Sequence, residues 1–150
     1  MIAAGFAGLA AARRLRQLRP AGAVEAMLQS NRLAAEVALA HGVTACTDIT
    51  GFGLLGHLLE MLGDNLGARL ALEGLPLLPG ALEQVRAGIT STMHAANATA
   101  AMDLVRTAGV DEARVQMLFD PQTSGGLLFG VEAGRVEELR DALREHGYGQ

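Results

Sequence analysis

The stretch of sequence that decides the fold is CTDITGFGLLGH, residues 46–57, which leads from a short strand through a glycine-rich turn into an apolar helix. The apolar run at 43–45, directly before it, is typical of a buried strand. From Gly53 onward the apolar residues recur at helical spacing, at Leu54, Leu55, Leu58, Leu59 and Leu62. The pattern therefore predicts that the turn joins a strand to a helix.

The predicted turn carries a carboxylate and two hydroxyls, at Asp48, Thr47 and Thr50. Unpaired backbone N–H groups and the positive end of the helix dipole favour an anion at the start of a helix. Asp48 would repel a bare phosphate, but a Mg²⁺ ion between the two would bind both, since Mg²⁺ prefers oxygen ligands. The turn is thus a candidate site for a metal-bound phosphate.

The same residues also allow a purely structural interpretation. Asp or Thr ahead of a helix often only caps the first turn, and Gly51, Gly53 and Gly56 can serve a tight turn and close packing. The stretch lacks the lysine of a Walker A loop and the spacing of a dinucleotide-binding motif. The spacing alone leaves ligand binding and capping open.

The composition indicates one globular domain with a single core. The chain has 150 residues, of which 50% are hydrophobic and 19% are charged. No apolar run reaches the roughly 18 residues that a membrane span needs, so no membrane segment is expected. A net charge of -4 at pH 7 and an aromatic content of 3% argue against nucleic-acid binding.

The single cysteine, Cys46, excludes an internal disulfide and favours a reducing compartment, the cytoplasm. Its sequence neighbours include no cation that would lower its pKa, so we expect a buried thiol at a strand end rather than a nucleophile. A secretory signal is not expected, because it would place its basic residues before the first apolar stretch. Here they follow that stretch, at Arg13, Arg14, Arg16 and Arg19.

Hydrophobic periodicity and helix stop signals predict the remaining elements. Asn31 lies on the apolar face of the first predicted helix, where a buried, hydrogen-bonded amide is favoured over a ligand-binding one. The predictions are helices at 24–41, 79–87, 98–108 and 133–146, a strand at 69–72, and a polar loop at 88–97 that contains His94 and Asn97. Strands that alternate with helices favour an α/β layered domain over a helical bundle.

A second glycine-rich loop, DPQTSGG at 120–126, precedes a strand predicted at 127–131. Pro121 keeps Asp120 extended, and the glycine pair allows a turn and a close backbone approach. Two polar, glycine-rich loops beside apolar strands are expected to share one edge of a sheet.

Together, these segments resemble a known family. The strings ACTDITGFGLLGH and LFDPQTSGGLL, with EAMLQSNRLAA before them and LPLLPGALE and GITSTMHAAN between them, are similar to the C-terminal domain of selenophosphate synthetase, also called selenide, water dikinase. The resemblance covers most of residues 24–147. It implies an α+β domain like that of aminoimidazole ribonucleotide synthetase, with a mixed β-sheet packed against several helices. The family makes selenophosphate, AMP and phosphate from ATP, selenide and water.

The resemblance also implies roles for the loop residues. Asp48 matches an aspartate that helps to bind Mg²⁺ at the ATP phosphates. His57 matches a position of the first signature, where a packed, hydrogen-bonded histidine is favoured over a catalytic base. Asp120 is expected to cap or brace its loop. The residues that match the rest of the nucleotide-binding loops are Thr47, Thr50, Gly51, Phe52, Gly53, Thr123, Ser124, Gly125 and Gly126.

Other parts of the family's active site have no counterpart in this sequence. The family's N-terminal domain carries most of the Mg²⁺-binding aspartates, a glycine-rich segment, a lysine, and a cysteine or selenocysteine. We therefore expect residues 1–150 to be a single C-terminal domain, trimmed at both ends and inactive alone, which pairs with an N-terminal ATP-binding domain and forms a homodimer. The alternatives are a stand-alone interaction or regulatory domain and another ATP-dependent enzyme of the same superfamily.

Overall fold

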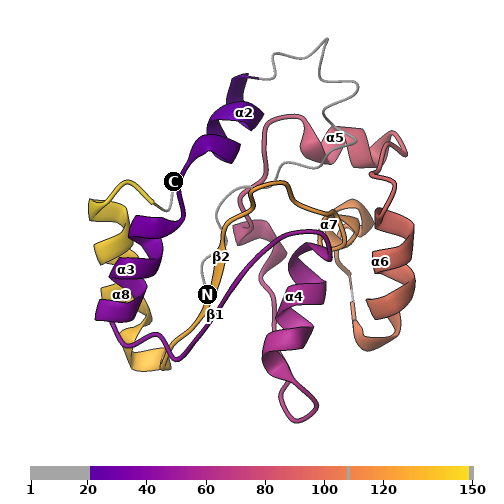
Figure 1. Ribbon diagram of the computed structural model, residues 1–150. Coiled ribbons are helices and arrows are strands. Elements are labelled where there is room, and N and C mark those ends of the chain that lie inside the picture. Colours follow the sequence, from indigo (N-terminus) through magenta and orange to yellow (C-terminus); the bar gives the residue numbers. More distant parts are fainter. Residues whose placement is uncertain (1–20, 108, 149–150) are drawn as a thin grey trace.

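The computed structural model describes residues 21–107 and 109–148. This part of the chain is a mixed α+β domain, as expected, with seven α-helices and one two-stranded antiparallel sheet (Figure 1). The helices are α2 (Ala21–Leu28), α3 (Arg32–Ala40), α4 (Gly53–Leu62), α5 (Ala81–Arg86), α6 (His94–Ala101), α7 (Glu112–Met117) and α8 (Val136–Glu145). The strands are β1 (Ala45–Asp48) and β2 (Leu127–Gly130), and three short 3-10 turns are η1 (Leu72–Gly74), η2 (Met102–Leu104) and η3 (Ala133–Arg135).

The sheet separates two hydrophobic clusters. β2 is apolar along its length, and successive side chains of a strand point to opposite faces. Leu128 accordingly belongs to a cluster with α4, and Phe129 to a second cluster with α3 and α8. Figure 1 shows α3 and α8 on one side of the strand pair and α4, α6 and α7 on the other. Both faces of β2 are therefore covered by helices.

The apolar spacing in the sequence predicted two helices well, α4 and α8. α4 begins at Gly53, as the apolar spacing predicts, and buries Leu54, Leu55 and Leu58. α8 buries Leu139 and Leu143 from its apolar stripe. The predicted strand at 127–131 is also confirmed, as β2.

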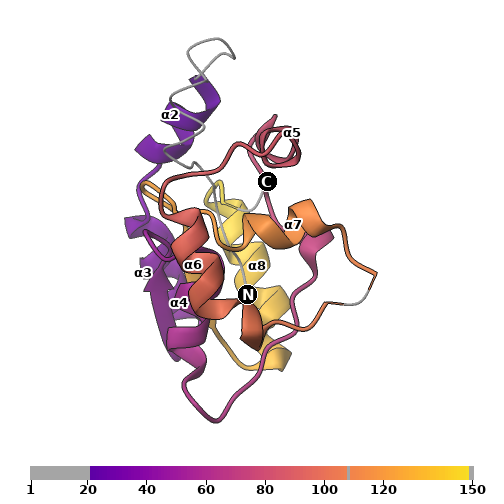
Figure 2. The ribbon, with the colours of Figure 1, turned by 90° about the vertical axis from the view of Figure 1, so that its right-hand side faces the viewer.

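The helix predicted at 24–41 is wrong in one respect, because it is broken into α2 and α3. The Ser30 hydroxyl accepts a hydrogen bond from the backbone N–H of Arg32 at 3.2 Å, which is the local bonding that favours serine at a helix start over a helix interior. The Asn31 side chain bonds outside the helix, to Gly125. In Figures 1 and 2, α2 extends away from the body of the domain.

The prediction for the first strand is also corrected. β1 occupies 45–48 rather than 43–45, and its side chains are mostly exposed rather than buried. Its residues are small or polar, so burying them would gain little apolar area. The strand predicted at 69–72 does not form, and the chain there is irregular before η1. Within the described residues, β1 and β2 pair only with each other, so no ladder partner stabilises that segment.

The middle of the chain differs most from its prediction. The polar loop at 88–97 ends early, because His94 and Asn97 lie in α6. This helix is rich in alanine, the best helix former, and it buries His94 and half-buries Asn97. The helix predicted at 98–108 is therefore replaced by the end of α6 and by η2. After η2, Val105 is extended and packs against the α4 cluster.

Two smaller differences concern helix boundaries. The helix predicted from Pro79 begins at Ala81, because Gly80 has a φ of 84°, which lies outside the right-handed helical region. α7 was not predicted. The side chain of Asp111, directly before α7, accepts a hydrogen bond from the backbone N–H of Ala113 at 3.0 Å and caps the first turn.

In the part of the chain described, no helix is both long and apolar enough to cross a membrane.

Candidate functional site

The turn between β1 and α4 depends on close backbone packing at Gly53. Its φ is +69°, a conformation that side-chain-bearing residues rarely adopt. A Cβ atom there would lie 2.8 Å from the carbonyl oxygen of Leu118. That same oxygen accepts a hydrogen bond from the backbone N–H of Leu55 at 3.0 Å. The glycine therefore lets the first turn of α4 pack directly on the segment that leads to the second loop.

Backbone hydrogen bonds join the two glycine-rich loops. The N–H of Ile49 donates to the carbonyl oxygen of Gly126 at 2.9 Å, and the N–H of Gln122 donates to that of Thr50 at 2.9 Å. A Cβ atom on Gly125 would lie 2.1 Å from the Ile49 oxygen, so only glycine fits there. The antiparallel pairing of β1 with β2 ends at this point, with Asp48 opposite Leu127. The expectation that both loops share one edge of the sheet is confirmed.

Two asparagine side chains brace these loops from other elements. The Nδ2 group of Asn97 donates to the carbonyl oxygens of Gly51, at 2.9 Å, and of Phe119, at 3.0 Å. The Nδ2 group of Asn31 donates to the carbonyl oxygen of Gly125 at 2.8 Å, as expected for a hydrogen-bonded structural amide. The Asn97 amide thus ties the first loop to the residue directly before the second loop, and the Asn31 amide holds the second loop itself.

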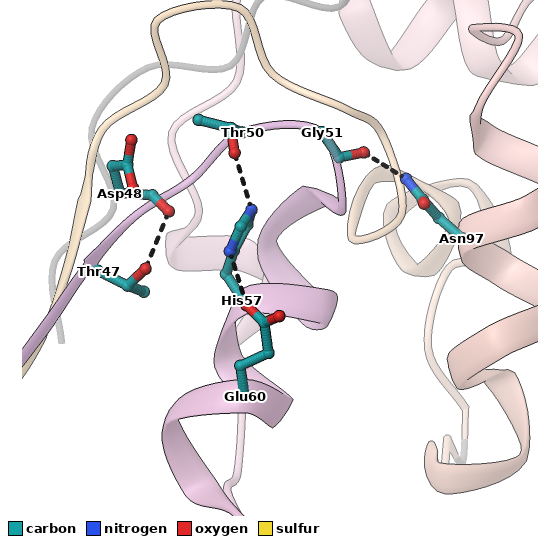
Figure 3. Close-up of polar contacts among 7 residues, drawn as sticks. All are labelled: Thr47, Asp48, Thr50, Gly51, His57, Glu60 and Asn97. Carbon is teal, nitrogen blue, oxygen red and sulfur yellow. Dashed lines mark hydrogen bonds and ion pairs between the residues drawn. The ribbon is translucent and has the colours of Figure 1, made fainter.

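A line of three side chains connects the turn to α4 (Figure 3). The Thr50 hydroxyl lies 3.1 Å from Nε2 of His57, and Nδ1 of His57 lies 3.1 Å from Oε2 of Glu60. The His57 side chain is 8% exposed, whereas that of Glu60 is 62% exposed. His57 is therefore packed and hydrogen-bonded at both ring nitrogens, the arrangement favoured from the sequence.

The predicted ligand residues divide into exposed and buried sets. Asp48, Phe52, Thr123 and Ser124 are exposed, whereas Thr47, Thr50 and Gly51 are half-buried. Gly53, Gly125 and Gly126 are buried and make the backbone scaffold. The Thr47 hydroxyl donates to the carbonyl oxygen of Asp48 at 3.2 Å. The arrangement leaves one carboxylate and two hydroxyl-bearing residues open at the sheet edge.

A magnesium ion fits Asp48 only as one ligand among several. The carboxylate is exposed and offers the oxygen atoms that Mg²⁺ prefers. Among the described residues, however, no group of three or more His, Cys, Asp or Glu side chains is placed to hold a metal ion. Octahedral coordination would then require oxygen atoms from phosphates, water or other protein segments.

Cys46 departs from its prediction, because it is exposed on β1 rather than buried at a strand end. Partial burial and the charge of the Asp48 carboxylate raise the pKa of the Cys46 thiol. A raised pKa lowers the thiolate fraction and therefore the reactivity. The expectation that Cys46 is not an activated nucleophile is supported, because its pKa is raised and not lowered, whereas the expected burial of the thiol is wrong.

Asp120 is the first residue of the second loop. Burial raises its pKa to about 6, against smaller opposing effects of His94 and of the hydrogen bond from Gln122. The Nε2 group of Gln122 donates to the Asp120 carbonyl oxygen at 2.9 Å and lies 3.4 Å from the carboxylate. Asp120 thus helps to brace its loop, as expected.

The sequence analysis did not find the roles of Asn97 and Glu60. Asn97 was placed in a polar loop, and the signal that could have corrected this is the alanine-rich segment around it. Glu60 follows His57 by three residues on one helix, a spacing at which side chains meet.

The sequence of residues 3–150 matches the family model described as "AIR synthase related protein, C-terminal domain". The chain belongs to this family. Its two signature loops are the ones that β1 and β2 bring together, so the resemblance drawn from those loops is confirmed by the match and by the relatives.

Several relatives bear the name "Selenide, water dikinase". The protein of Trichlorobacter lovleyi is 44% identical over 115 residues, which cover 76% of this chain and 33% of the relative. That of Shewanella baltica is 43% identical over 126 residues, covering 83% and 35%, and that of Agathobacter rectalis is 37% identical over 133 residues, covering 85% and 39%. The chain thus spans about a third of the length of the curated relatives it matches.

Proposed function

We propose that this chain is the C-terminal part of a selenophosphate synthetase, which makes selenophosphate, AMP and phosphate from ATP, selenide and water. The proposal rests on its membership of the AIR synthase related family and on its similarity to relatives named selenide, water dikinase. Two backbone hydrogen bonds between the loops, from Ile49 to Gly126 and from Gln122 to Thr50, support the assignment of this function to the loop residues.

In this function, the chain supplies one side of the active site, formed by the two linked loops, rather than a whole active site. Asp48 would contribute one carboxylate oxygen to Mg²⁺, which when bound neutralises and orients phosphate oxygens. Thr123 and Ser124 are exposed beside the same edge and can donate hydrogen bonds to an anion. The buried glycines Gly53, Gly125 and Gly126 keep the backbone close enough to hold these groups in place.

The remaining ligands would come from an N-terminal ATP-binding domain of the kind that the family resemblance implies. Phosphoryl transfer depends on several charges that act together, so the chain is expected to be inactive alone. We expect the protein to form a homodimer and to act in the cytoplasm. The single cysteine is consistent with a reducing compartment.

Complementation tests this function. The chain would be mixed with a separately produced N-terminal part of the Trichlorobacter lovleyi relative, and selenide-dependent AMP formation would be measured. We expect turnover only in the mixture. The Asp48→Asn variant should lose at least the roughly 10- to 100-fold that changes to the hydrogen-bond partners of metal ligands usually cause.

Asp64→Asn is the matched control, because Asp64 is also exposed but lies in the turn after α4, away from both loops. It should leave turnover unchanged. If the two parts associate but form no AMP, or if Asp48→Asn and Asp64→Asn behave alike, the assignment of Asp48 and of this chain to the synthetase reaction is wrong.

A further inference from the structure

Thr50 is the residue at which α4 and the second loop meet. Its hydroxyl lies 3.1 Å from Nε2 of His57, and its carbonyl oxygen accepts the backbone N–H of Gln122 at 2.9 Å. The same carbonyl oxygen also accepts from the N–H of Gly53 at 3.1 Å. The position of Thr50 therefore depends at once on the helix, on the turn and on the second loop.

The partners of His57 determine the direction of its hydrogen bonds. A carboxylate only accepts, so the Nδ1 atom beside Glu60 must carry the proton. In the neutral ring Nε2 is then an acceptor, and the Thr50 hydroxyl donates to it. The ring also packs against Phe52, with centroids 5.5 Å apart. Glu60 and Phe52 thus hold the ring in one tautomer and one orientation.

Asp48 depends on this arrangement through the backbone. Its carboxylate is exposed, and within residues 21–107 and 109–148 its side chain makes no hydrogen bond that would orient it. In Figure 3 the Thr50 hydroxyl points toward α4, whereas the Asp48 carboxylate points away from it. The carboxylate is therefore presented by the end of β1, where Asp48 pairs with Leu127, and by the turn that follows, which is fastened at Ile49 and at Thr50.

We infer that His57 and Glu60 are positioning residues that act through Thr50 to hold the two loops, and with them Asp48, in the geometry of the site. This inference rests on the proposed function for its catalytic consequence. Residues that orient the neighbours of a metal ligand commonly change activity by about 10- to 100-fold when they are removed.

The first test uses the whole chain and needs no turnover. Thr50→Val removes the hydroxyl at nearly constant volume, and His57→Leu removes the ring nitrogens. In both variants we expect amide hydrogen exchange at Gln122 to become about fivefold faster, since a net hydrogen bond of about 1 kcal/mol is lost. His57→Gln, whose amide reaches the position of Nε2, should restore most of the protection.

The spectroscopic signature of the ring gives a second readout. Nitrogen-15 shifts of neutral His57 should show a protonated Nδ1 and an unprotonated Nε2, and Glu60→Ala should shift the ring toward a mixture of tautomers. Packing alone would not produce this dependence on Glu60.

Two control variants remove the same chemical groups elsewhere. Thr99→Val deletes a hydroxyl that bonds the Ala95 carbonyl oxygen on α6, and His41→Leu deletes a ring that bonds the Val37 carbonyl oxygen on α3. Neither should change exchange at Gln122. Unchanged exchange in folded Thr50→Val, or a wild-type ring protonated at Nε2 and not at Nδ1, overturns the inference. Thr50 is only half-buried, so this variant decides the question even if His57→Leu does not fold.

The consequence for activity is measured in the mixture with the N-terminal part. His57→Leu should lower kcat about tenfold, by more than it changes the KM for ATP, with recovery in His57→Gln. A mixture of wild-type parts without turnover would count against the proposed function alone, because exchange and ring shifts are read from this chain by itself. Unaltered kcat in His57→Leu, with Asp48→Asn inactive, would overturn the positioning role.

Discussion

The side-chain amide of Asn31 donates a 2.8 Å hydrogen bond to the carbonyl oxygen of Gly125, 94 residues further along the chain. This bond ties the segment between α2 and α3 to the second glycine-rich loop. It also accounts for a polar residue in a stripe that the sequence pattern assigns to the core.

Replacing Asn31 with Ala should destabilise the protein by about 1 kcal/mol, because the carbonyl oxygen of buried Gly125 loses its donor. Chemical denaturation, followed by circular dichroism, measures this change as a shift of the midpoint. Asn65→Ala, in the exposed turn after α4, is the control and should leave the midpoint in place. Equal midpoints for the two variants would show that the long-range bond contributes nothing to stability.

Gly125→Ala should be strongly destabilising, by about 3 kcal/mol, or should force the loops apart. The added Cβ would lie 2.1 Å from the Ile49 carbonyl oxygen and 2.9 Å from Cβ of Gln122, and neither neighbour is free to withdraw without breaking the link between the loops. Thermal and chemical denaturation measure the loss. Gly134→Ala, which meets nothing within 4 Å, is the control, and a Gly125→Ala variant as stable as this control would refute the close contact.

Stability should depend on pH through Asp120, whose pKa is raised to about 6 by burial. An unfolded aspartate titrates near pKa ~3.9, so the folded state binds more protons between about pH 4 and pH 6. The stabilising contribution of the protonated group is complete below about pH 4 and is lost as the pH rises through 6. A shift of this size corresponds to about 3 kcal/mol.

Asp120→Asn should therefore be more stable than the wild type at pH 7.5 and should lose that advantage at pH 4. Denaturation curves at a series of pH values provide the measurement. Asp64→Asn, at an exposed site, should follow the wild-type curve throughout. If the Asp120→Asn and wild-type curves run parallel across this range, the carboxyl group does not titrate as the burial requires.

Cys46 should react slowly with iodoacetamide for an exposed thiol, because partial burial and the Asp48 charge raise its pKa. Asp48→Asn removes the charge and should lower the pH at which the alkylation rate reaches half of its maximum. Rates measured by mass spectrometry between pH 7 and pH 10 would show the shift. Asp64→Asn serves again as the control. If the pH profile of Asp48→Asn is identical to that of the wild type, the Asp48 carboxylate does not affect the pKa of the Cys46 thiol.

Local patterns were sufficient for the elements whose apolar residues recur at a regular spacing or form an unbroken run. The spacing of apolar residues after Gly53 predicted α4, and the run after Gly126 predicted β2. The shared edge of the two loops also followed from sequence, because a polar glycine-rich segment beside an apolar strand has few other places to lie. Asp48 was named from the pattern of the first loop, whereas Thr123 and Ser124 were named only from the family resemblance.

The elements that were predicted wrongly depend on partners far away in the sequence. The 69–72 segment, Arg-Leu-Ala-Leu, contains no β-branched or aromatic residue and has no strand beside it among the described residues. A strand without a ladder is not stable. His94 and Asn97 looked like loop residues because polar side chains usually face water. In the structure they face inward, and Asn97 donates to the carbonyl oxygens of Gly51 and Phe119.

By itself, the sequence determined the helix after Gly53, the apolar strand after Gly126 and the apolar stripe of α8, because backbone freedom at glycine and hydrophobic spacing act over a few neighbouring residues. Only the tertiary structure decided that Ile49 bonds Gly126, that Thr50 bonds both His57 and Gln122, and that Cys46 lies on an exposed strand. The bonds of Ile49 to Gly126 and of Gln122 to Thr50 join residues far apart in the chain, and they form only when the two hydrophobic clusters bring β1 and β2 together.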